Sequence, residues 1–386
     1  MRRSPFAAFA GIFVVTLLSL MAVGAVLPVL PRYVRGPLDS GDIAVGVVVG
    51  SYALTGLAGR PLAGRLADHR GRKPMVIVGT LLAALAGLLY FLPTGLPGLI
   101  GARLVLGLGE GSVFTAGSAW IVDLAPPGRR GRVIGLYGLA VWSGLSIGPS
   151  IGELLYHAAG FHLVWAFAAA APFLGALVAL RIRDPFEPSR QAIRGPLIAR
   201  ESIRPGVALS LASVGYAAMA SFIVLRLQAD GDSHGAIAFT VFAATVVLTR
   251  LLAGDLPDRI GPLRCAAGAA AVESLGLALI ALATSLPMAI VGSAAMGTAF
   301  SLLYPSLSLV VVNQVPEGRR GAALGTFTGF FDLGVGLGAP LAGIAAALGG
   351  YPAAFWLASA CALGTLSVAL ALRRGWSGSR APAPIA

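Results

Sequence analysis

The chain has 386 residues, of which 57% are hydrophobic and 11% are charged, and its mean hydropathy is +0.85. This composition excludes an ordinary soluble domain. The formal charge of +12 would suggest a nucleic-acid partner in a soluble protein, so the positions of the basic residues decide what that charge means.

Helices that cross a bilayer need about 20 mostly apolar residues, and the chain divides into twelve such segments. We place those of the first half at 7–30, 43–63, 74–93, 98–121, 132–156 and 161–181. We place those of the second half at 206–227, 236–254, 265–283, 287–311, 321–347 and 353–372. The first segment follows two arginines, as a signal peptide would, but its apolar run is too long and further spans follow.

A long internal repeat indicates that the chain contains two copies of one unit. The stretch 60–71 returns as 250–261 with 7 of its 12 positions identical, and the same offset of 190 superimposes 122–131 on 312–321. We therefore predict two six-helix units, and we expect the Pro- and Arg-rich segment between them to be a cytoplasmic linker. The predicted boundaries are an N-terminal bundle at 1–182, a linker at 183–205, a C-terminal bundle at 206–374 and a disordered tail at 375–386.

The basic residues are distributed as expected for a membrane protein with cytoplasmic termini. With that orientation, 24 of the 28 lie in cytoplasmic loops, tails or helix ends, and the exceptions are Arg32, Arg35, Arg103 and Arg226 (28 − 4 = 24). This positive-inside bias predicts a multi-pass protein of a bacterial-type inner or plasma membrane, with both termini cytoplasmic. It also argues against a nucleic-acid partner.

The repeated stretch carries a charged, glycine-containing motif between the second and third spans. We predict a short cytoplasmic loop in which the glycines allow a tight turn and Asp68 pairs with an arginine or a helix N-terminus. The residues singled out in the first copy are Gly64, Asp68, Gly71, Arg72 and Lys73. Those in the second copy are Gly254, Asp258, Arg259 and Gly261.

These residues resemble the signature loop of the major facilitator superfamily, G-x-L-A-D-R-x-G-R-K, with His69 and Pro262 as departures. Arg103–Gly111 resembles the R-x-x-x-G-x-G motif of the fourth helix in that family, and Pro28–Pro31 matches P-V-x-P of its twelve-span exporters. The resemblance implies an all-α membrane protein with twelve transmembrane helices in two pseudo-symmetric six-helix bundles. It also implies that both loops act as gates. A weaker likeness, carried by the stretches 109–111, 272–276 and 331–334, is to the YfcJ/YhhS-type group, which is thought of as a group of exporters.

The predicted fifth span carries glycines at every fourth position. Gly144, Gly148, Pro149 and Gly152 match the pattern of the proton-linked exporters, apart from Glu153 in place of a final glycine. The glycines allow close helix packing and the proline should kink the helix. We expect a rocking seam between the halves, with plain packing in the lipid phase as the alternative.

Four of the ionisable residues inside predicted spans are candidates for a pathway or a relay, which such residues usually mark. Glu110 and Arg103 lie seven residues apart on one face of the fourth span and are expected to share a polar cavity, with the glycines around Glu110 leaving room for water. Asp332 lies at the position that corresponds, through the repeat, to Trp142 in the other half. Glu273 has no evident partner. The alternatives are that Arg103 holds the first helix through backbone carbonyls and that the acids are structural.

The function that these features favour is proton-coupled efflux of a small molecule by alternating access. The sequence has no nucleotide-binding G-x-x-x-x-G-K-[ST] loop, and Glu110 and Asp332 can exchange protons. Alternatives are a facilitator or proton symporter that imports a solute and, from another class, a non-transporting receptor or assembly factor. We expect a monomer whose partners are its substrate, protons and the lipid bilayer, with no enzymatic activity, cofactor or metal site.

Overall fold

The computed structural model describes residues 5–92, 94–124, 130–182, 199–231, 235–315 and 320–376. The regular elements of these ranges are helices. In the N-terminal half they are α1 (Pro5–Val26), α2 (Leu30–Arg35), α3 (Asp42–Arg70), α4 (Arg72–Leu89), α5 (Gly95–Leu124) and α6 (Arg130–Arg181). In the C-terminal half they are η1 (Arg200–Ser202), α7 (Ile203–Ala229), α8 (Ala236–Ala253), α9 (Leu256–Ile260), α10 (Pro262–Leu282), α11 (Leu286–Val312) and α12 (Arg320–Trp376).

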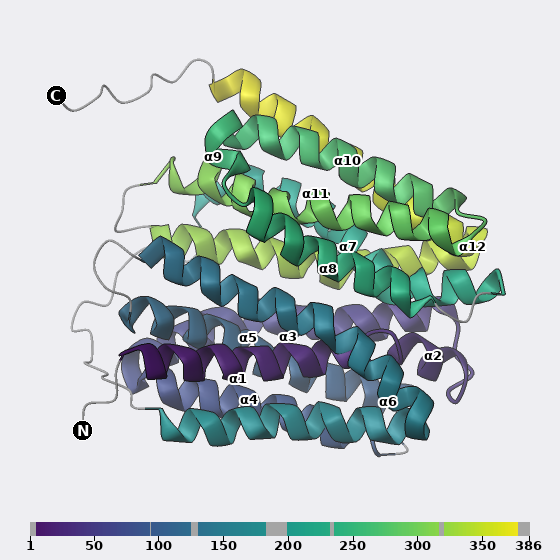
Figure 1. Cartoon of the computed structure of the whole chain (residues 1–386), viewed down its shortest axis with the longest axis horizontal. Coiled ribbons are helices and arrows are strands. Elements are labelled where there is room, and N and C mark those ends of the chain that lie inside the picture. The colour runs from purple at the N-terminus through teal and green to yellow at the C-terminus, as the bar shows by residue number, and fades with distance from the viewer. Residues whose placement is uncertain are drawn as a thin grey trace.

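Ten helices of the described chain are long and apolar enough to cross a membrane, and two of them contain two crossings each. The 52 residues of α6 would extend about 78 Å as one straight helix, more than twice the hydrocarbon core of a bilayer. Instead, α6 leaves helical geometry at Ala159 and Gly160, and α12 does so at Gly349 and Gly350. Figure 1 shows α6 folding back at its break. The twelve predicted crossings are therefore confirmed.

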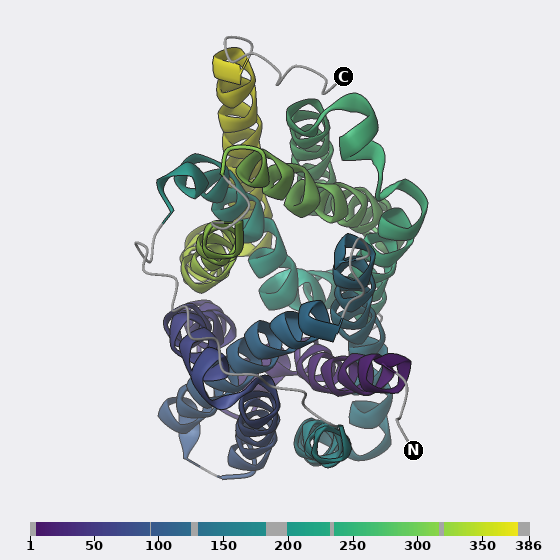
Figure 2. The ribbon, with the colours of Figure 1, turned by 90° about the vertical axis from the view of Figure 1, so that its left-hand side faces the viewer.

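The helices lie side by side along the long axis of the molecule, and the two halves occupy opposite sides of it (Figures 1 and 2). Within the N-terminal half α1 packs on α6, and within the C-terminal half α7 packs on the first part of α12. Two main crossings join the halves, α3 on α12 and α6 on α8, and α2 and α3 make smaller contacts with α7. Leucines such as Leu252 and Leu348 stay largely exposed, as expected for helices that present apolar side chains to lipid.

The signature stretches are more helical than predicted. We expected a loop around 64–73, but α3 continues through Pro61 to Arg70, and Gly71 alone separates it from α4. Gly261 likewise separates α9 from α10. Two other boundaries also differ, because α7 begins inside the predicted linker and α12 ends at Trp376, inside the predicted tail. Pro205 is compatible with that start because the first turn of a helix has no intrahelical acceptor for its N–H groups.

Some predictions concern residues outside the described part of the chain. These include most of the linker at 183–198, the tail from 377 onward and the side chain of Asp68. They remain expectations.

Candidate functional site

The α3–α12 crossing contains an ion pair between the two halves. Arg60 of α3 donates from Nε to Oδ2 of Asp332 on α12 at 2.5 Å, and from Nη2 to Oδ1 at 3.0 Å. The side chains are 13% and 3% exposed, and the guanidinium also lies 4.8 Å from the ring centre of Phe114. A bidentate pair at this depth is costly to break, because separation leaves a buried charge uncompensated.

Close backbone contact between α3 and α12 continues from this pair toward the other end of the bundle. A Cβ atom at Gly46 would lie 2.2 Å from the carbonyl oxygen of Ala339, and one at Gly50 would lie 3.0 Å from that of Gly336. No side chain fits at Gly46 without moving α12. The ion pair therefore sits on a tightly packed crossing.

The α6–α8 crossing contains a second arginine, but its surroundings differ. Arg250 of α8 donates from Nη2 to the carbonyl oxygen of Ser301 at 3.0 Å, and its guanidinium lies 5.7 Å from the ring centre of Trp142 on α6. Its buried Nε has no hydrogen-bond partner, and it forms no ion pair with a carboxylate in the described ranges. Ser146 of α6 also donates across this crossing to the carbonyl oxygen of Ala243 at 2.6 Å.

The repeat relates these two arginines and the residues that face them. Arg60 and Arg250 are equivalent (250 − 60 = 190), and so are Trp142 and Asp332 (332 − 142 = 190). Each arginine therefore faces the same register position of the opposite half, which is Asp332 in one case and Trp142 in the other. Sequence reasoning singled out Asp332 and its register but missed both arginines as partners. The signal was available, because both lie in the repeated stretch.

Glu110 of α5 is half-buried and lies within electrostatic reach of Arg60, Asp332 and Arg103. Within the described ranges it has no hydrogen bond or ion pair. The expectation that nearby glycines leave room around it is wrong for two of them. A Cβ at Gly107 would lie 1.9 Å from the carbonyl oxygen of Tyr52 on α3, and one at Gly109 would lie 2.7 Å from that of Gly79 on α4.

Arg103 is fully buried and does not share an open cavity with Glu110. It donates from Nε to the carbonyl oxygen of Val48 at 3.1 Å and from Nη2 to that of Val49 at 2.9 Å, and it stacks on Tyr52 at 4.5 Å. The contacts match the alternative in which Arg103 holds a helix through backbone carbonyls. The helix is α3, the second span, and not the first.

Glu273 of α10 is fully buried, and neither carboxyl oxygen has a partner among the described residues. Its Oε1 would lie 2.8 Å from a Cβ at Gly215 of α7, and Met296 of α11 borders the same position. The structure therefore places Glu273 inside the C-terminal half, away from the α3–α12 ion pair.

Aromatic side chains form a chain beside Arg250. Trp142 meets Phe300 edge-on at 5.5 Å, Phe300 stacks with Tyr216 at 5.9 Å, and Tyr216 lies 5.9 Å from Phe331. The hydroxyl of Tyr304 lies within electrostatic reach of Arg60, Arg250 and Asp332. These rings come from both halves and surround the charged residues with apolar surface.

The signature residues lie at the end of the bundle where α1 starts and α12 ends (Figure 1). Gly71 has φ +101° and forms the predicted tight turn, whereas Gly64, for which a turn was also predicted, lies inside α3. In the second copy Gly261 has φ +92°. Arg72 pairs with Asp123 at 3.1 Å, Lys73 donates to the carbonyl oxygen of Leu180 at 2.8 Å, and Arg259 pairs with Asp255 at 2.5 Å. Within the described part, the structure shows no ion pair or side-chain hydrogen bond at Gly64, Gly254 or Asp258.

The glycine face of α6 packs on α1 of the same half rather than at the seam between the halves. Cβ atoms at Gly144, Gly148 and Gly152 would lie 2.9, 2.6 and 1.9 Å from α1 carbonyl oxygens. Pro149 lies within the helix next to this face. The predicted close packing is therefore present, but the residues of α6 that meet α8 are others, such as Ser146 and Ser150.

Glu153, the departure from the glycine pattern, has a specific role in the structure. It accepts two hydrogen bonds from Nη1 of Arg32, both at 2.9 Å, and contacts His157 at 3.1 Å. Arg32 was recognised in the sequence only as an exception to the charge bias. The two residues are 121 positions apart, so sequence spacing gave no signal of the pair.

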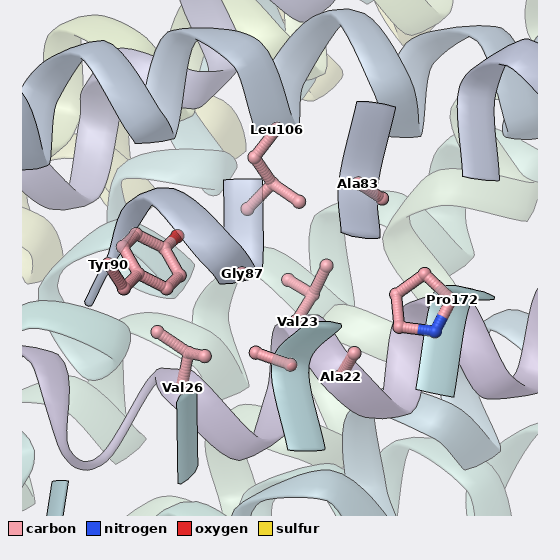
Figure 3. Close-up of a pocket in the computed structure, with 9 residues that line it drawn as sticks. Ala22, Val23, Val26, Ala83, Gly87, Tyr90, Leu106 and Pro172 are labelled. Atoms are coloured by element: carbon pink, nitrogen blue, oxygen red, sulfur yellow. The ribbon is translucent and has the colours of Figure 1, made fainter. Parts of the chain in front are cut away.

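A small cavity of about 10 Å³ lies inside the N-terminal half (Figure 3). It is bordered by Val23 and Val26 of α1, Ala83 of α4 and Leu106 of α5, among others. Its volume suits at most about one water molecule and its walls are apolar. It is therefore a packing defect and not a substrate site.

Comparison with known sequences identifies the relatives of this chain. The sequence model of the Major Facilitator Superfamily matches residues 12–235 and 206–384. The MFS-type transporter YhhS of Escherichia coli (strain K12) is 36% identical over 368 residues, covering 92% of this chain and 88% of YhhS. An MFS-type transporter of Salmonella typhimurium (strain LT2) is 34% identical, covering 92% of this chain and 94% of the relative. Both carry the description "uncharacterized".

Comparison with solved structures gives the same fold. A mutant form of the nucleoside transporter NupG matches with a TM-score of 0.81 at 14% identity, covering 95% of this chain and 99% of NupG. The human organic anion transporter MFSD10 matches with a TM-score of 0.74 at 18% identity, covering 95% of this chain and 100% of MFSD10. At these identities the likeness concerns the fold alone.

Proposed function

Because this chain belongs to the Major Facilitator Superfamily, and is thus a multi-pass membrane transporter, we propose that it couples proton movement to efflux of a small molecule. The proposal rests on one observation: two carboxyl groups, Glu110 and Asp332, lie within electrostatic reach of one buried guanidinium, that of Arg60. Asp332 holds it in a bidentate ion pair, whereas Glu110 has no ion-pair partner among the described residues.

This arrangement supports a mechanism in which the proton controls the contact between the halves. Arg60 and Glu110 belong to the N-terminal half and Asp332 to the C-terminal half. While Glu110 carries a proton, it does not compete for Arg60, and the cross-half pair with Asp332 is favoured. When Glu110 loses the proton, its negative charge attracts Arg60 and weakens that pair. Proton release would thereby lower the barrier to separating α3 from α12.

The direction of transport and the orientation in the membrane are parts of the same proposal. The α6 glycine–proline pattern resembles that of the proton-linked exporters, which favours efflux over import or facilitated diffusion. The charge bias favours an inner membrane location with both termini and the linker in the cytoplasm. Cysteine labelling at positions 190 and 234 checks the orientation. A membrane-impermeant reagent should react at 234 and not at 190 in intact cells.

The signature stretches are proposed to gate the cytoplasmic side, with Asp68 making a contact between the halves that exists only in the outward-open state. Asp68→Asn should then shift the resting population toward the inward-open state while the protein stays folded. Distances between spin labels on the cytoplasmic ends of α3 and α12 measure this population. Unchanged distances would remove Asp68 from the gate.

The central experiment separates binding from coupling. Growth of strains that overexpress or lack the protein, on a panel of toxic compounds, identifies a transported solute. In proteoliposomes, Glu110→Gln should still exchange that solute across the membrane but should no longer accumulate it against its gradient when a pH difference is imposed. Accumulation that persists in Glu110→Gln and is lost in Asp332→Asn would assign the proton to Asp332. Accumulation in both variants would refute proton coupling through either carboxyl group.

A further inference from the structure

Within the described residues, Arg250 differs from most of the buried or partly buried arginines in having no carboxylate partner. Arg60 pairs with Asp332, Arg32 with Glu153, and Arg226 with Asp230. Arg103 also lacks a carboxylate within the described ranges, but it is completely enclosed and donates to two carbonyl oxygens. Arg250 donates to one carbonyl oxygen and faces one aromatic ring, and its Nε has no hydrogen-bond partner among the described residues.

The pseudo-symmetry indicates what is missing at Arg250. At the equivalent arginine, the opposite half supplies the carboxylate of Asp332, and at Arg250 it supplies the ring of Trp142. Arg250 therefore carries, in the last turn of α8, a partly buried positive charge that no carboxylate of the described residues neutralises. A buried charge is unfavourable unless it pairs with a counter-ion.

The surroundings of Arg250 suit an anion with an apolar body. Its guanidinium borders Gly138, which has no side chain: a Cβ at that position would lie 3.5 Å from Nη1. The ring of Trp142 faces the charge and meets Phe300 edge-on, and the Tyr304 hydroxyl lies within electrostatic reach. A guanidinium binds a carboxylate by charge-assisted hydrogen bonds, and the Trp142 ring would contact the rest of the ligand.

We propose that Arg250 binds the carboxylate of an amphipathic organic acid, which is the substrate class of the transport activity proposed above and rests on it. The bound carboxylate takes the place that Asp332 occupies at Arg60. Both crossings between the halves then hold a neutralised arginine. The ligand thereby connects α8 to α6, and its release leaves Arg250 joined to α6 by the weaker cation–π contact with Trp142, beside the serine hydrogen bonds of that crossing.

The test uses purified full-length protein in nanodiscs and needs no knowledge of the natural substrate. The probes are 2-naphthoate, cyclohexanecarboxylate and 4-phenylbutyrate, each with its uncharged carboxamide. Binding is measured by thermal stabilisation and by calorimetry at constant pH. We expect at least one acid to bind at least about tenfold more tightly than its amide, since charge-assisted pairing distinguishes them.

Three variants locate the binding site. Arg250→Gln should weaken binding of the acid at least about tenfold and leave the weak binding of the amide unchanged. Trp142→Asp should also abolish binding of the acid, because the repeat register places the new carboxylate where it can occupy Arg250. The matched control is Arg264→Gln, which removes an exposed arginine of α10 and should change nothing.

Several outcomes would overturn the proposal. Equal binding of acids and amides, no binding of any acid at millimolar concentration, or acid binding that survives Arg250→Gln would each do so. Melting curves of the ligand-free variants show whether each protein is folded, and Arg250→Lys provides a second variant that keeps the charge and should keep part of the preference for acids. Failure here, with pH-driven transport still dependent on Glu110, leaves the proposed function intact. Acid binding without pH-driven transport would instead refute proton coupling.

Discussion

The two crossings between the halves are built on the same register but are stabilised by different physical interactions. At α3–α12 the arginine is neutralised by a bidentate carboxylate, and the backbones touch at Gly46 and Gly50. At α6–α8 the equivalent arginine faces an aromatic ring, and serine hydroxyl groups make the other cross-half hydrogen bonds. A buried ion pair resists separation by several kcal/mol, whereas a cation–π contact contributes about 0.5–2 kcal/mol.

Under the two proposals made above, this difference would give the two crossings separate tasks. At the α3–α12 crossing, one proton on Glu110 can alter the balance of charge around Arg60, because Glu110 lies within electrostatic reach of Arg60. The α6–α8 crossing leaves its positive charge available to a ligand. A two-copy chain can in this way keep one fold in both halves and place ion coupling and substrate binding at equivalent positions.

The largest effect is expected from removing the carboxylate at α3–α12. Asp332→Asn leaves Arg60 buried without its counter-ion and should lower the free energy of unfolding by about 3–5 kcal/mol. Trp142→Phe, the equivalent position at the other crossing, keeps an aromatic ring beside Arg250 and should cost about 1 kcal/mol or less. Thermal unfolding in a mild detergent compares the two variants directly.

A double-mutant cycle checks the cause of that loss. Arg60→Gln combined with Asp332→Asn removes both charges and should be more stable than the sum of the single losses predicts, by at least about 1 kcal/mol. Additive losses, or a loss in Asp332→Asn no greater than in Trp142→Phe, would mean that the two crossings do not differ in the way proposed.

The comparison of halves extends to the interior of each bundle. Ala83 borders a small apolar cavity in the N-terminal half, and the equivalent position in the C-terminal half is Glu273 (273 − 83 = 190). Leu106, which borders the cavity, corresponds to Met296, which lies beside Glu273 (296 − 106 = 190). One half therefore holds a buried carboxyl group where the other has an alanine and a small void.

Replacing Glu273 by an apolar side chain should stabilise the protein. Neither of its oxygens has a partner in the described structure, and an unsatisfied buried polar group costs about 1–3 kcal/mol. Glu273→Met should gain a comparable amount, while the control Glu273→Gln keeps an unsatisfied polar group and should gain little. If Glu273→Met is folded but loses pH-driven transport, Glu273 belongs to the proton pathway that its position in a span first suggested.

Much of the fold could be predicted from the sequence because the signals were local or periodic. Apolar run lengths gave the twelve crossings, the 190-residue offset gave the equivalence of Asp332 and Trp142, and Gly71 and Gly261 were recognised as turns. Each of these depends on spacing along the chain.

The partners across the halves could not be predicted in the same way. Arg60 meets Asp332 only because α3 docks on α12, and their separation of 272 positions follows no spacing rule. Helical periodicity placed Arg103 and Glu110 on one face, but it could not tell that the Arg103 side chain would turn to the α3 carbonyl groups. Glycine motifs predicted close packing without saying which helix would fill the space.

Gly71 and Gly261, which each separate two consecutive helices, should be equally sensitive to substitution, whereas the two crossings should differ. Gly71 and Gly261 have φ of +101° and +92°, a region that is unfavourable for residues with a Cβ. Gly71→Ala and Gly261→Ala should each cost about 1–2 kcal/mol. Gly64→Ala is the control, since its new methyl group would meet Thr115 at an ordinary 3.6 Å and should cost little. A large loss in Gly64→Ala would show that the motif depends on packing rather than on the turn.

The smallest effect is expected from removing the exposed hydrogen bond between α6 and α8. Ser150 and Thr240 share a hydrogen bond of 3.2 Å at an exposed position, so Ser150→Ala should cost no more than about 0.5–1 kcal/mol. Ser146 would still donate to Ala243 across the same crossing, which limits the loss. Thermal unfolding of Ser150→Ala, Ser146→Ala and the double variant measures both contributions, and the loss at buried Ser146 should be the larger. If Ser150→Ala alone destabilises the protein as much as Asp332→Asn does, the α6–α8 crossing is not the weaker one. The conclusion that the two crossings differ in strength would then fail.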